Sequence, residues 1–544
     1  PCGDRRPTAL SRWLHVQQAI GCKGCRGLRS DGRPCCASSG FHYIVPEKSA
    51  LRPRPLELVV DGISFGFSID HSKTIRHHMT SKRRAISLLL CTVRGIMLFG
   101  QAPNIVWQRT YGGSDDDVAR SSQRTSDGGH LVAGFTYSND GDVEGQHGYR
   151  DLWVFKLDSS GVIQWQRTMG NASWNEAEHV RGTPDGGCIL AGTTADGVQF
   201  DHWLVKLDSL GQTEWERVYG GTGTDIGWSV AMASDGGFLS VGSTDSQDGD
   251  VIGNHGQTDL WVARTDAAGN PLWQRCYGGT GAEYYGSIKQ TPEGGYVVLA
   301  VSNSTDGDLT SNQGSGDLWV VKLDIEGDIE WQRSFGGSSG EDPRNIICTA
   351  DGGFMMVGFS ASNDGDLTSN QGSNDAWLVK LDSGGELQWQ RSYGGANNDI
   401  ATDVVQMEDG GYLFVGSTMS TEGSSFGNHG LSDFWVVRTD PSGDVLWHRC
   451  LGGSDGDAGY SIAPLPNGHV MLAGFTQSPD GDVLGFLGVR DVWMIELGAE
   501  DLTTDIPRSS PEPFVLAPNP TDGLVRFAPY RSGSTGLIQV FNAM

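Results

Sequence analysis

One segment returns seven times along this chain, and it constrains the fold more than any other feature. It reads WQRTYGG at its first occurrence and WHRCLGG at its last, and successive copies are 58 residues apart except for one interval of 50. The tryptophans that open the copies are Trp107, Trp165, Trp215, Trp273, Trp331, Trp389 and Trp447. Self-similarity at a fixed period is typical of solenoids, propellers and other repeat arrays.

Each copy contains four short segments with the pattern of β-strands. In the third copy they are residues 225–234, 238–244, 259–265 and 271–279, and the first two are joined by Asp-Gly-Gly. Glycine adopts a positive φ without steric cost, so this turn indicates a hairpin. A second tryptophan row, in the motif D-x-W, lies in the third segment of each copy: Trp153, Trp203, Trp261, Trp319, Trp377, Trp435 and Trp493.

Four strands repeated around an axis predict an all-β fold, a seven-bladed β-propeller of four-stranded antiparallel blades over residues 103–498. The first copy begins with an extra strand at Trp107, and the last ends after the strand at Trp493. We therefore expect the N-terminal strand to close the ring as the outermost strand of the seventh blade, which removes two exposed sheet edges. The alternative is a linear solenoid, but a solenoid requires capping repeats at its ends, and none is visible in the sequence.

The W-Q-R-x-x-G-G, D-G-G and D-x-W-x-x-K-L-D elements of residues 103–498 resemble those of the secreted β-propeller repeat proteins common in the Bacteroidota. The resemblance implies a propeller that works outside the cell. It implies little about activity, because unrelated functions share this architecture.

Charge is distributed unevenly along the chain. Residues 1–100 carry 16 Lys and Arg against 6 Asp and Glu, so the remainder carries 39 − 16 = 23 basic and 66 − 6 = 60 acidic side chains. A surface that acidic repels phosphates and anionic lipid headgroups, which excludes nucleic acid and membrane surfaces as expected partners.

The segment 79–102 has the pattern of a secretory signal peptide. Lys82, Arg83 and Arg84 precede the apolar run 85–93, and small residues follow at the exit. The run is too short and interrupted for a stable membrane span, and the alternative is a buried strand. Residues 1–78 then form a leader expected to be non-native or disordered. Four of its cysteines could together bind a zinc ion: Cys22, Cys25, Cys35 and Cys36. Short cysteine patterns of this kind also arise by chance.

The C-terminal tail indicates where in or outside the cell the protein is delivered. A linker over 499–513 precedes residues 514–544, where Pro518-Asn519-Pro520 opens a segment that resembles the start of a type IX secretion sorting domain, truncated at Met544. The resemblance implies the type IX secretion machinery as a partner and an extracellular or outer-membrane surface location. An ordinary proline turn before a strand is the alternative.

The loop between the second and third strands carries candidate calcium ligands. In the first blade it reads SNDGDVEGQHGYRD, with two aspartates one residue apart and a third at its end. Such oxygen ligands suit calcium, although Asp before Gly also builds turns without any metal. The candidate ligands are Asp140, Asp142, Asp151, Asp248, Asp250, Asp259, Asp306, Asp308, Asp317, Asp364, Asp366, Asp375, Asp480, Asp482 and Asp491.

The last aspartate of each loop belongs to D-x-W and is expected to be structural, because catalysis needs one site rather than seven equal ones. His147, His255 and His429 share a position that Gln313 and Gln371 also occupy, which favours a polar turn residue. Antiparallel strand order predicts that these D-G-D loops and the G-G connections lie on one acidic face, opposite the D-G-G turns.

No motif of a hydrolase elbow, a zinc protease or a phosphate cradle is present. His179, Arg181, Lys289 and Asp403 are non-repeating polar residues on expected first strands, so they could converge at the central channel. Four propeller cysteines are expected to be free, buried thiols without disulfides: Cys188, Cys276, Cys348 and Cys450.

Together these patterns favour a secreted or cell-surface propeller that serves as a binding or adhesion scaffold for a glycan or protein ligand. The alternatives are a hydrolase or lyase acting on polysaccharide, with its site in the channel near the second blade, and a purely structural surface protein. Two carboxylates with His or Arg clustered in the channel would favour the enzyme.

Overall fold

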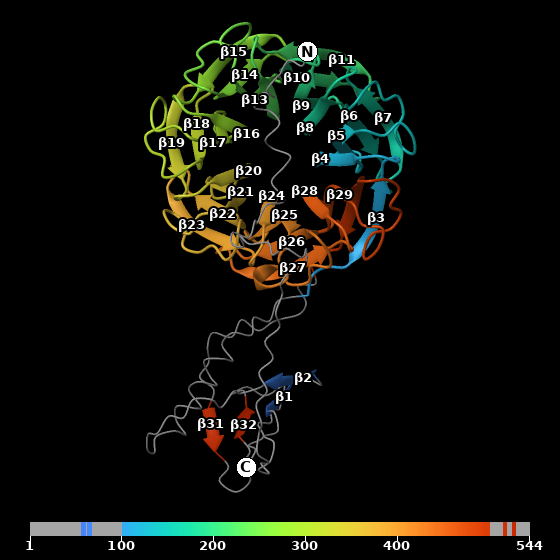
Figure 1. Ribbon diagram of the computed structural model, residues 1–544, viewed down its shortest axis with the longest axis vertical. Coiled ribbons are helices and arrows are strands. Elements are labelled where there is room, and N and C mark those ends of the chain that lie inside the picture. The colour runs from blue at the N-terminus through green and yellow to red at the C-terminus, as the bar shows by residue number, and fades with distance from the viewer. Residues whose placement is uncertain (1–55, 61–62, 68–100, 501–514, 519–524, 529–544) are drawn as a thin grey trace, which may run out of the picture. The chain divides into compact units, whose positions relative to one another are not determined.

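The computed structural model describes the backbone of residues 56–60, 63–67, 101–500, 515–518 and 525–528, and the side chains of residues 101–500. The chain divides into two units, residues 80–508 and residues 1–79 with 509–544. The first unit is a ring of seven four-stranded antiparallel sheets (Figure 1). The predicted seven-bladed all-β propeller is therefore confirmed.

Each sheet forms one blade, and the strands of each blade are named in order from the axis outward. Blade 1 contains β4 (Asp117–Arg124), β5 (His130–Thr136), β6 (Asp151–Leu157) and β7 (Ile163–Met169). Blade 2 contains β8 (Asn175–Gly182), β9 (Cys188–Ala195), β10 (Phe200–Leu207) and β11 (Thr213–Tyr219). Blade 3 contains β12 (Asp225–Met232), β13 (Phe238–Thr244), β14 (Asp259–Thr265) and β15 (Pro271–Tyr277). Blade 4 contains β16 (Glu283–Gln290), β17 (Tyr296–Ser302), β18 (Asp317–Leu323) and β19 (Ile329–Phe335).

The remaining blades follow the same order. Blade 5 contains β20 (Glu341–Cys348), β21 (Phe354–Ser360), β22 (Asp375–Leu381) and β23 (Leu387–Tyr393). Blade 6 contains β24 (Asp399–Gln406), β25 (Tyr412–Thr418), β26 (Asp433–Thr439) and β27 (Val445–Leu451), with the 3-10 turn η2 (Gly423–Ser425) in its long loop. Blade 7 contains β28 (Asp457–Pro464), β29 (Val470–Thr476), β30 (Asp491–Leu497) and β3 (Ile105–Tyr111).

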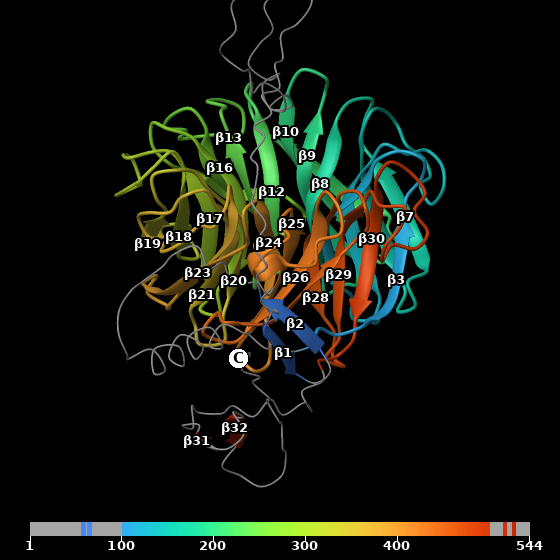
Figure 2. The ribbon, with the colours of Figure 1, turned by 60° about the horizontal axis from the view of Figure 1, so that its bottom comes forward.

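The two middle strands of each blade form the core. Every residue of β13 and β14 is buried, because both faces of the sheet pack against neighbouring blades. The outer strand β15 remains half-exposed. Figure 2 shows the blades side by side around the axis, with their connecting loops gathered at the two rims of the ring.

Apolar packing joins each blade to the next. The core of residues 101–500 forms seven clusters, and each draws on two neighbouring blades. In one of them Trp319 of blade 4 packs with Leu239 and Val262 of blade 3. The indole N–H of Trp319 donates to Oε1 of Gln332, the glutamine of W-Q-R, at 3.0 Å. The D-x-W tryptophans thus fill the blade interfaces, and five of the seven bond their one polar atom to a glutamine of the neighbouring outer strand, whereas the indole nitrogen of Trp435 is buried without a hydrogen-bond partner among the described residues.

The N-terminal strand closes the ring as predicted. Strand β3 pairs with β30 in blade 7, and Thr110 lies opposite Trp493. The hydroxyl of Tyr111 on β3 then donates to the carbonyl oxygen of Gly161 in blade 1, at 2.6 Å. The first strand of the propeller therefore holds blade 7 and contacts blade 1, which excludes an open solenoid.

The second unit contains two described hairpins, β1 (Leu56–Val60) with β2 (Ile63–Phe67) and β31 (Val515–Pro518) with β32 (Val525–Ala528). The proposed zinc cysteines, nearly all of the proposed signal peptide and most of the linker lie outside the described residues. The leader, signal peptide and sorting domain stay predictions. In the part of the chain that the structure describes, no helix is long and apolar enough to cross a membrane.

Candidate functional site in the central channel

The D-G-D loops hold the blades together through backbone contacts. Oδ1 of Asp140 accepts the N–H of Ser114 at 2.7 Å, and Oδ2 of Asp142 accepts the N–H of Gly112 at 3.4 Å. Ser114 lies in the G-G connection that leads into β4, so the loops and these connections share one face of the ring, as predicted. Asp248, Asp306, Asp364 and Asp480 accept the equivalent N–H groups in their own blades.

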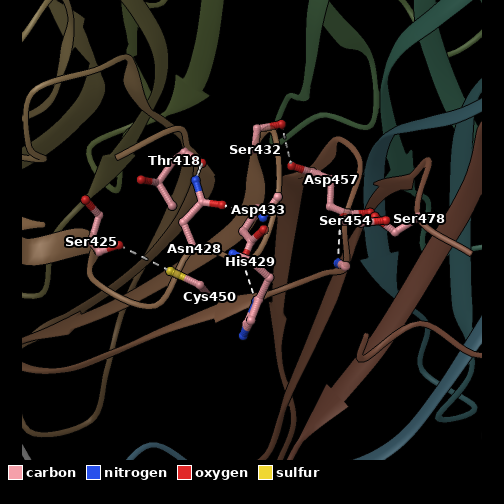
Figure 3. A network of polar contacts seen from close by, with 12 residues as sticks. Thr418, Ser425, Asn428, His429, Ser432, Asp433, Cys450, Ser454, Asp457 and Ser478 are labelled. Atoms are coloured by element: carbon pink, nitrogen blue, oxygen red, sulfur yellow. Dashed lines mark hydrogen bonds and ion pairs between the residues drawn. The ribbon is translucent and has the colours of Figure 1, made fainter. Parts of the chain in front are cut away.

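The last aspartate of each full-length loop fixes the start of the third strand. Figure 3 shows this network in blade 6, where Asp433 accepts both the N–H and the ring Nδ1 of His429, at 3.0 and 2.7 Å. Asn428 donates from its side chain to the carbonyl oxygen of Thr418, at 3.0 Å. The structural role predicted for the D-x-W aspartates and for the loop histidines is confirmed here.

Calcium binding by these loops stays a prediction. Within residues 101–500, no three His, Cys, Asp or Glu side chains are grouped so that they could hold one metal ion. Oδ1 of Asp140 and Oδ2 of Asp151 accept backbone N–H groups, which is the turn chemistry that the sequence left open, whereas Oδ1 of Asp151 is buried without a hydrogen-bond partner in the described part of the chain.

A further buried row, which the sequence analysis missed, begins each inner strand. Oδ2 of Asp457 accepts the N–H of Gly453 at 3.0 Å and the hydroxyl of Ser478 at 2.8 Å, and its Oδ1 accepts the hydroxyl of Thr476 at 2.5 Å (Figure 3). The row consists of Asp117, Asn175, Asp225, Glu283, Glu341, Asp399 and Asp457. The recurrence of G-G-x-x-x-[DEN] with a later Thr or Ser pair would have identified it.

The opposite face also carries carboxylates, and those of five D-G-G turns form ion pairs. Asp185 of the D-G-G turn in blade 2 pairs with Lys206 at 2.8 Å, and Asp351 pairs with Lys380 at 2.9 Å. The Lys or Arg of the third strand supplies the cation in each case.

A cavity of about 430 Å³ lies at the axis of the ring and is lined by the inner strands of all seven blades. His179, Arg181, Lys289 and Asp403 all line it. The structure therefore brings the four predicted channel residues together. Three positions of the inner strand supply most of the lining, two adjacent and the third two residues further on, and each position forms a row around the axis.

The first row consists of bulged residues. Every inner strand shifts register by one residue or more near its start, as between Ala119 and Ser121 in β4, and the extra residue faces the channel. This bulge row is Arg120, Glu178, Trp228, Gly286, Arg344, Thr402 and Tyr460. The row lies toward the D-G-D face, because it follows three residues after the strand begins.

Blade 4 departs from the pattern in a way that places an aromatic ring in the row. Its bulge residue is Gly286, and the preceding position, small in the other blades, is Tyr285. Tyr285 has a φ of 58°, and no other non-glycine residue has a positive φ among those described. Backbone strain of this kind costs about 1–3 kcal/mol and collects at functional sites.

Side chains of the bulge row stack on one another at the mouth of the cavity. The rings of Trp228 and Tyr285 lie 4.6 Å apart, and the guanidinium of Arg344 lies 4.6 Å from the Tyr285 ring centre. Arg120 lies 5.1 Å from the ring centre of Tyr460. A nitrogen of Arg120 is also 3.7 Å from a carboxylate oxygen of Glu178. Burial raises the pKa of Glu178 to about 7, although Arg120 opposes the shift.

The second row links the blades. The hydroxyl oxygen of Ser121 accepts the N–H of Val180, and that of Ser461 accepts the N–H of Ser122. His179 accepts the N–H of Val230 on its Nδ1 at 3.2 Å, and burial with the nearby Arg181 and Lys289 holds its pKa well below the usual value. This lock row is Ser121, His179, Ser229, Ser287, Asn345, Asp403 and Ser461.

Asp403 of the lock row has both oxygens occupied. Oδ2 accepts the N–H of Ile462 at 2.8 Å, and Oδ1 accepts from Val404 and the side chain of Asn345. Burial nevertheless raises its pKa. His179 and Asp403 are therefore held in contacts between and within blades rather than poised for catalysis.

The third row lies deeper and contains two cations, Arg181 and Lys289. Burial lowers the pKa of Lys289 to about 7, and the charge of Arg181 adds to the effect. In all, five basic residues line the cavity against two carboxylates: Arg120, Arg124, Arg181, Lys289 and Arg344 against Glu178 and Asp403. The channel is basic although the propeller around it is acidic.

The four propeller cysteines are free thiols, as predicted. Cys188, Cys276 and Cys450 are buried, whereas Cys348 is half-buried near the channel.

Comparison with known proteins gives a likeness in fold and no family. No protein-family model matches the chain. The chain is 28% identical over 162 residues to the regulatory protein FlaEY of Caulobacter vibrioides, a match that covers 27% of this chain and 16% of that protein. The similar stretch is thus a small part of that relative's length.

Several solved structures are similar to this chain at low sequence identity. A protein of unknown function from Bacteroides caccae is 11% identical with a TM-score of 0.33, over 55% of this chain and 86% of that one. The WD40 domain of Neurospora crassa Pan2 is 10% identical with a TM-score of 0.42, over 73% and 97%. A PL25 ulvan lyase is 9% identical with a TM-score of 0.44, over 72% and 96%. At these identities the likenesses bear on fold alone.

Proposed function

We propose that this chain is a ligand-binding propeller whose ligand, a glycan or a protein, enters the channel cavity at the bulge row. One observation carries the proposal. The repeat is nearly uniform at its structural positions, yet the bulge row holds a different residue in almost every blade and faces the cavity. Variation in a half-buried row that faces a cavity creates a singular surface on a symmetric scaffold, and convergent polar and aromatic groups in a concavity are typical of binding sites.

The contacts within the channel favour binding over catalysis. The enzyme alternative requires free carboxylates with His or Arg in the cavity. Glu178, with a pKa near 7, is one such group. The second carboxylate, Asp403, and His179 already accept hydrogen bonds from neighbouring backbone N–H groups. A general acid–base pair needs both members within reach of substrate protons, and here one is fully engaged.

The test is a binding screen with the full chain against glycan and protein arrays. We expect the double variant Trp228→Ala/Tyr460→Ala to lose at least about tenfold in affinity for any ligand found, because each ring supplies contact area at the mouth. Tyr149→Ala is the matched control, since Tyr149 is 63% exposed and does not line the cavity. Equal binding by the double variant and the control would overturn the proposal, and ligand turnover would establish the enzyme instead.

We propose further that the protein acts outside the cell or at the outer-membrane surface, delivered by type IX secretion. Its support is the signal-peptide pattern of residues 79–102 and the resemblance of residues 514–544 to a sorting domain. Cell fractionation with sequencing of the mature N-terminus tests it, and retention inside the cell would refute it.

Calcium is proposed as an assisting ion of the D-G-D loops, supported by their paired aspartates. Melting and binding are compared in calcium and in chelator. A melting temperature and a ligand affinity that do not change between the two conditions would remove calcium from the proposal.

A further inference from the structure

The charge of the channel is opposite to that of the molecule that surrounds it. Residues 101–544 carry 23 basic and 60 acidic side chains, whereas the cavity lining carries five basic and two acidic ones. Cations concentrated in a concave site with low-dielectric walls focus a positive potential there. The cavity therefore favours a negatively charged ligand group, although the acidic surface around it repels one.

Two of these cations have no carboxylate partner within ion-pair distance. Among residues 101–500, no ion pair involves Arg181 or Lys289. Lys289 donates to the neutral side chain of Asn345 at 3.1 Å. The carboxylate of Asp403 is engaged by Ile462 and Asn345. Two half-buried cations without an anion raise the free energy of the empty site, and a bound anion would relieve that cost.

The mouth above these cations presents two aromatic–guanidinium pairs. Arg344 stacks on Tyr285, itself against Trp228, on the side of blades 3 to 5. Arg120 stacks on Tyr460 on the side of blades 7 and 1. The face of an aromatic ring carries partial negative charge and attracts the C–H groups of a sugar face. Guanidiniums held flat beside the rings offer paired donors to carboxylate or sulfate oxygens.

The walls favour a saccharide over an acidic peptide. An extended peptide commonly binds by adding a strand to a free sheet edge. Along the inner edges here, the N–H groups of Ser122, Val180, Val230 and Ile462 already donate to side chains of the lock row. The cavity of about 430 Å³ also suits one or two sugar rings rather than a folded partner.

We propose, building on the channel-binding function, that this site takes the end of an anionic saccharide. Its sugar rings stack on Trp228 and Tyr460, and its carboxylate or sulfate group reaches Arg181 and Lys289. Arg120 and Arg344 bind a second anionic group at the mouth.

Calorimetric titration of the full chain tests the proposal with four probes: tetragalacturonate, a sulfated oligosaccharide of equal length, a neutral galactose tetramer and a tetra-aspartate peptide. Binding of either acidic saccharide at least about tenfold tighter than the neutral one supports it, and the stronger of the two identifies the anionic group. Tighter binding of the peptide than of any saccharide would overturn it.

Two variants test the deep cations without disturbing the fold. Lys289→Ala and Arg181→Ala introduce the residue that stands at the same repeat position in blades 3 and 7, where it is Ala231 and Ala463. Each should weaken binding of the acidic saccharide about tenfold and leave the melting temperature within about 2 °C. Arg391→Ala, which removes an exposed cation outside the channel, is the matched control.

The outcomes separate this inference from the function on which it rests. If the channel binds the neutral tetramer as tightly as the acidic ones, and Trp228→Ala/Tyr460→Ala abolishes that binding, the channel function stands and the anionic assignment fails. If the double variant binds every probe as the native chain does, the channel function itself fails. Equal effects of Lys289→Ala and Arg391→Ala would also defeat the anionic assignment.

Discussion

At the scale of single residues, the seven copies act as an internal comparison. The buried row that starts the inner strands holds Asp in four blades, Glu in two and Asn175 in one. Asn175 accepts the hydroxyl of Thr194 on its Oδ1 at 2.7 Å, as the acids accept theirs. The position therefore requires a hydrogen-bond acceptor rather than a charge.

This requirement predicts the effect of substitutions at Asp457. Asp457→Ala leaves the Gly453 N–H and the hydroxyls of Thr476 and Ser478 without their acceptor, so we expect the free energy of unfolding to fall by about 2–4 kcal/mol. Asp457→Asn keeps an acceptor and should cost less than half as much. Urea denaturation followed by tryptophan fluorescence measures both, and equal losses would refute the acceptor role.

Residues also mark the limit of what could be predicted from sequence. His179, Arg181, Lys289 and Asp403 were identified because they interrupt a regular repeat on an expected inner strand. Arg120, Trp228 and Tyr285 were not, because a bulge inserts one residue and changes the face on which all earlier residues of the strand point. A bulge depends on local hydrogen bonding that periodicity does not reveal.

At the scale of elements, the third strand of six of the seven blades begins at a buried aspartate. Burial raises the pKa of Asp375 to about 6 and that of Asp491 to about 7, although the N–H groups of Gln371 and Leu487 oppose the shifts. The inner-strand residue Asp117 shows the same effect, with a pKa of about 6. These strands therefore begin at groups that hold protons more tightly in the folded chain than in the unfolded one.

The sign of the resulting pH dependence follows from linkage. Because the folded pKa values of these three carboxyls exceed the unfolded value near 3.8, they bind more protons in the folded state between about pH 7 and pH 4. Burial lowers the pKa of His130, His202 and His448 to about 4, which offsets part of this proton uptake. Lowering the pH across this window should raise the melting temperature by about 2–5 °C. Asp491→Asn should reduce that rise, and a melting temperature that falls steadily from pH 7 to pH 4.5 would contradict the prediction.

Below this window the ion pairs of the opposite face reverse the trend. Burial raises the pKa of Asp185, but hydrogen bonds from Lys206, Thr183 and Gly187 together with the Lys206 charge lower it to about 2. Thr349, Lys380 and Gly353 act together in the same way on the pKa of Asp351. A depressed pKa contributes stability that is lost as pH falls from about 4 through 2. Maximum stability is therefore expected near pH 4 to 5, unusually low for a folded domain.

At the scale of the whole molecule, the architecture was predictable because it is periodic. Seven copies fixed the number of blades, and the surplus strand at Trp107 fixed the closure at β30. The proposed ligand site was not predictable in the same way, because the proposal rests on the few bulge-row positions at which the copies differ. Periodicity identifies the scaffold, and departures from it identify the site.

Ring closure is the one interface of the propeller that joins the two ends of the repeat region. In blade 7, Gln108 on β3 accepts the indole N–H of Trp493 at 2.9 Å. In blade 3, Gln274 on β15 accepts that of Trp261 at 2.7 Å, but a short turn connects the two strands there. Gln108→Ala and Gln274→Ala therefore remove the same contact, and each should lower the free energy of unfolding by about 1–3 kcal/mol. The two variants differ in that a short turn joins the paired strands in blade 3 and none joins them in blade 7.

We expect hydrogen exchange of the β3 amides in Gln108→Ala to quicken about tenfold. The β15 amides in Gln274→Ala should change less than threefold, since the turn keeps that strand in place. Exchange measured by mass spectrometry on both variants decides the point, and equal acceleration in β3 and β15 would show that closure depends on contacts other than this strand pair.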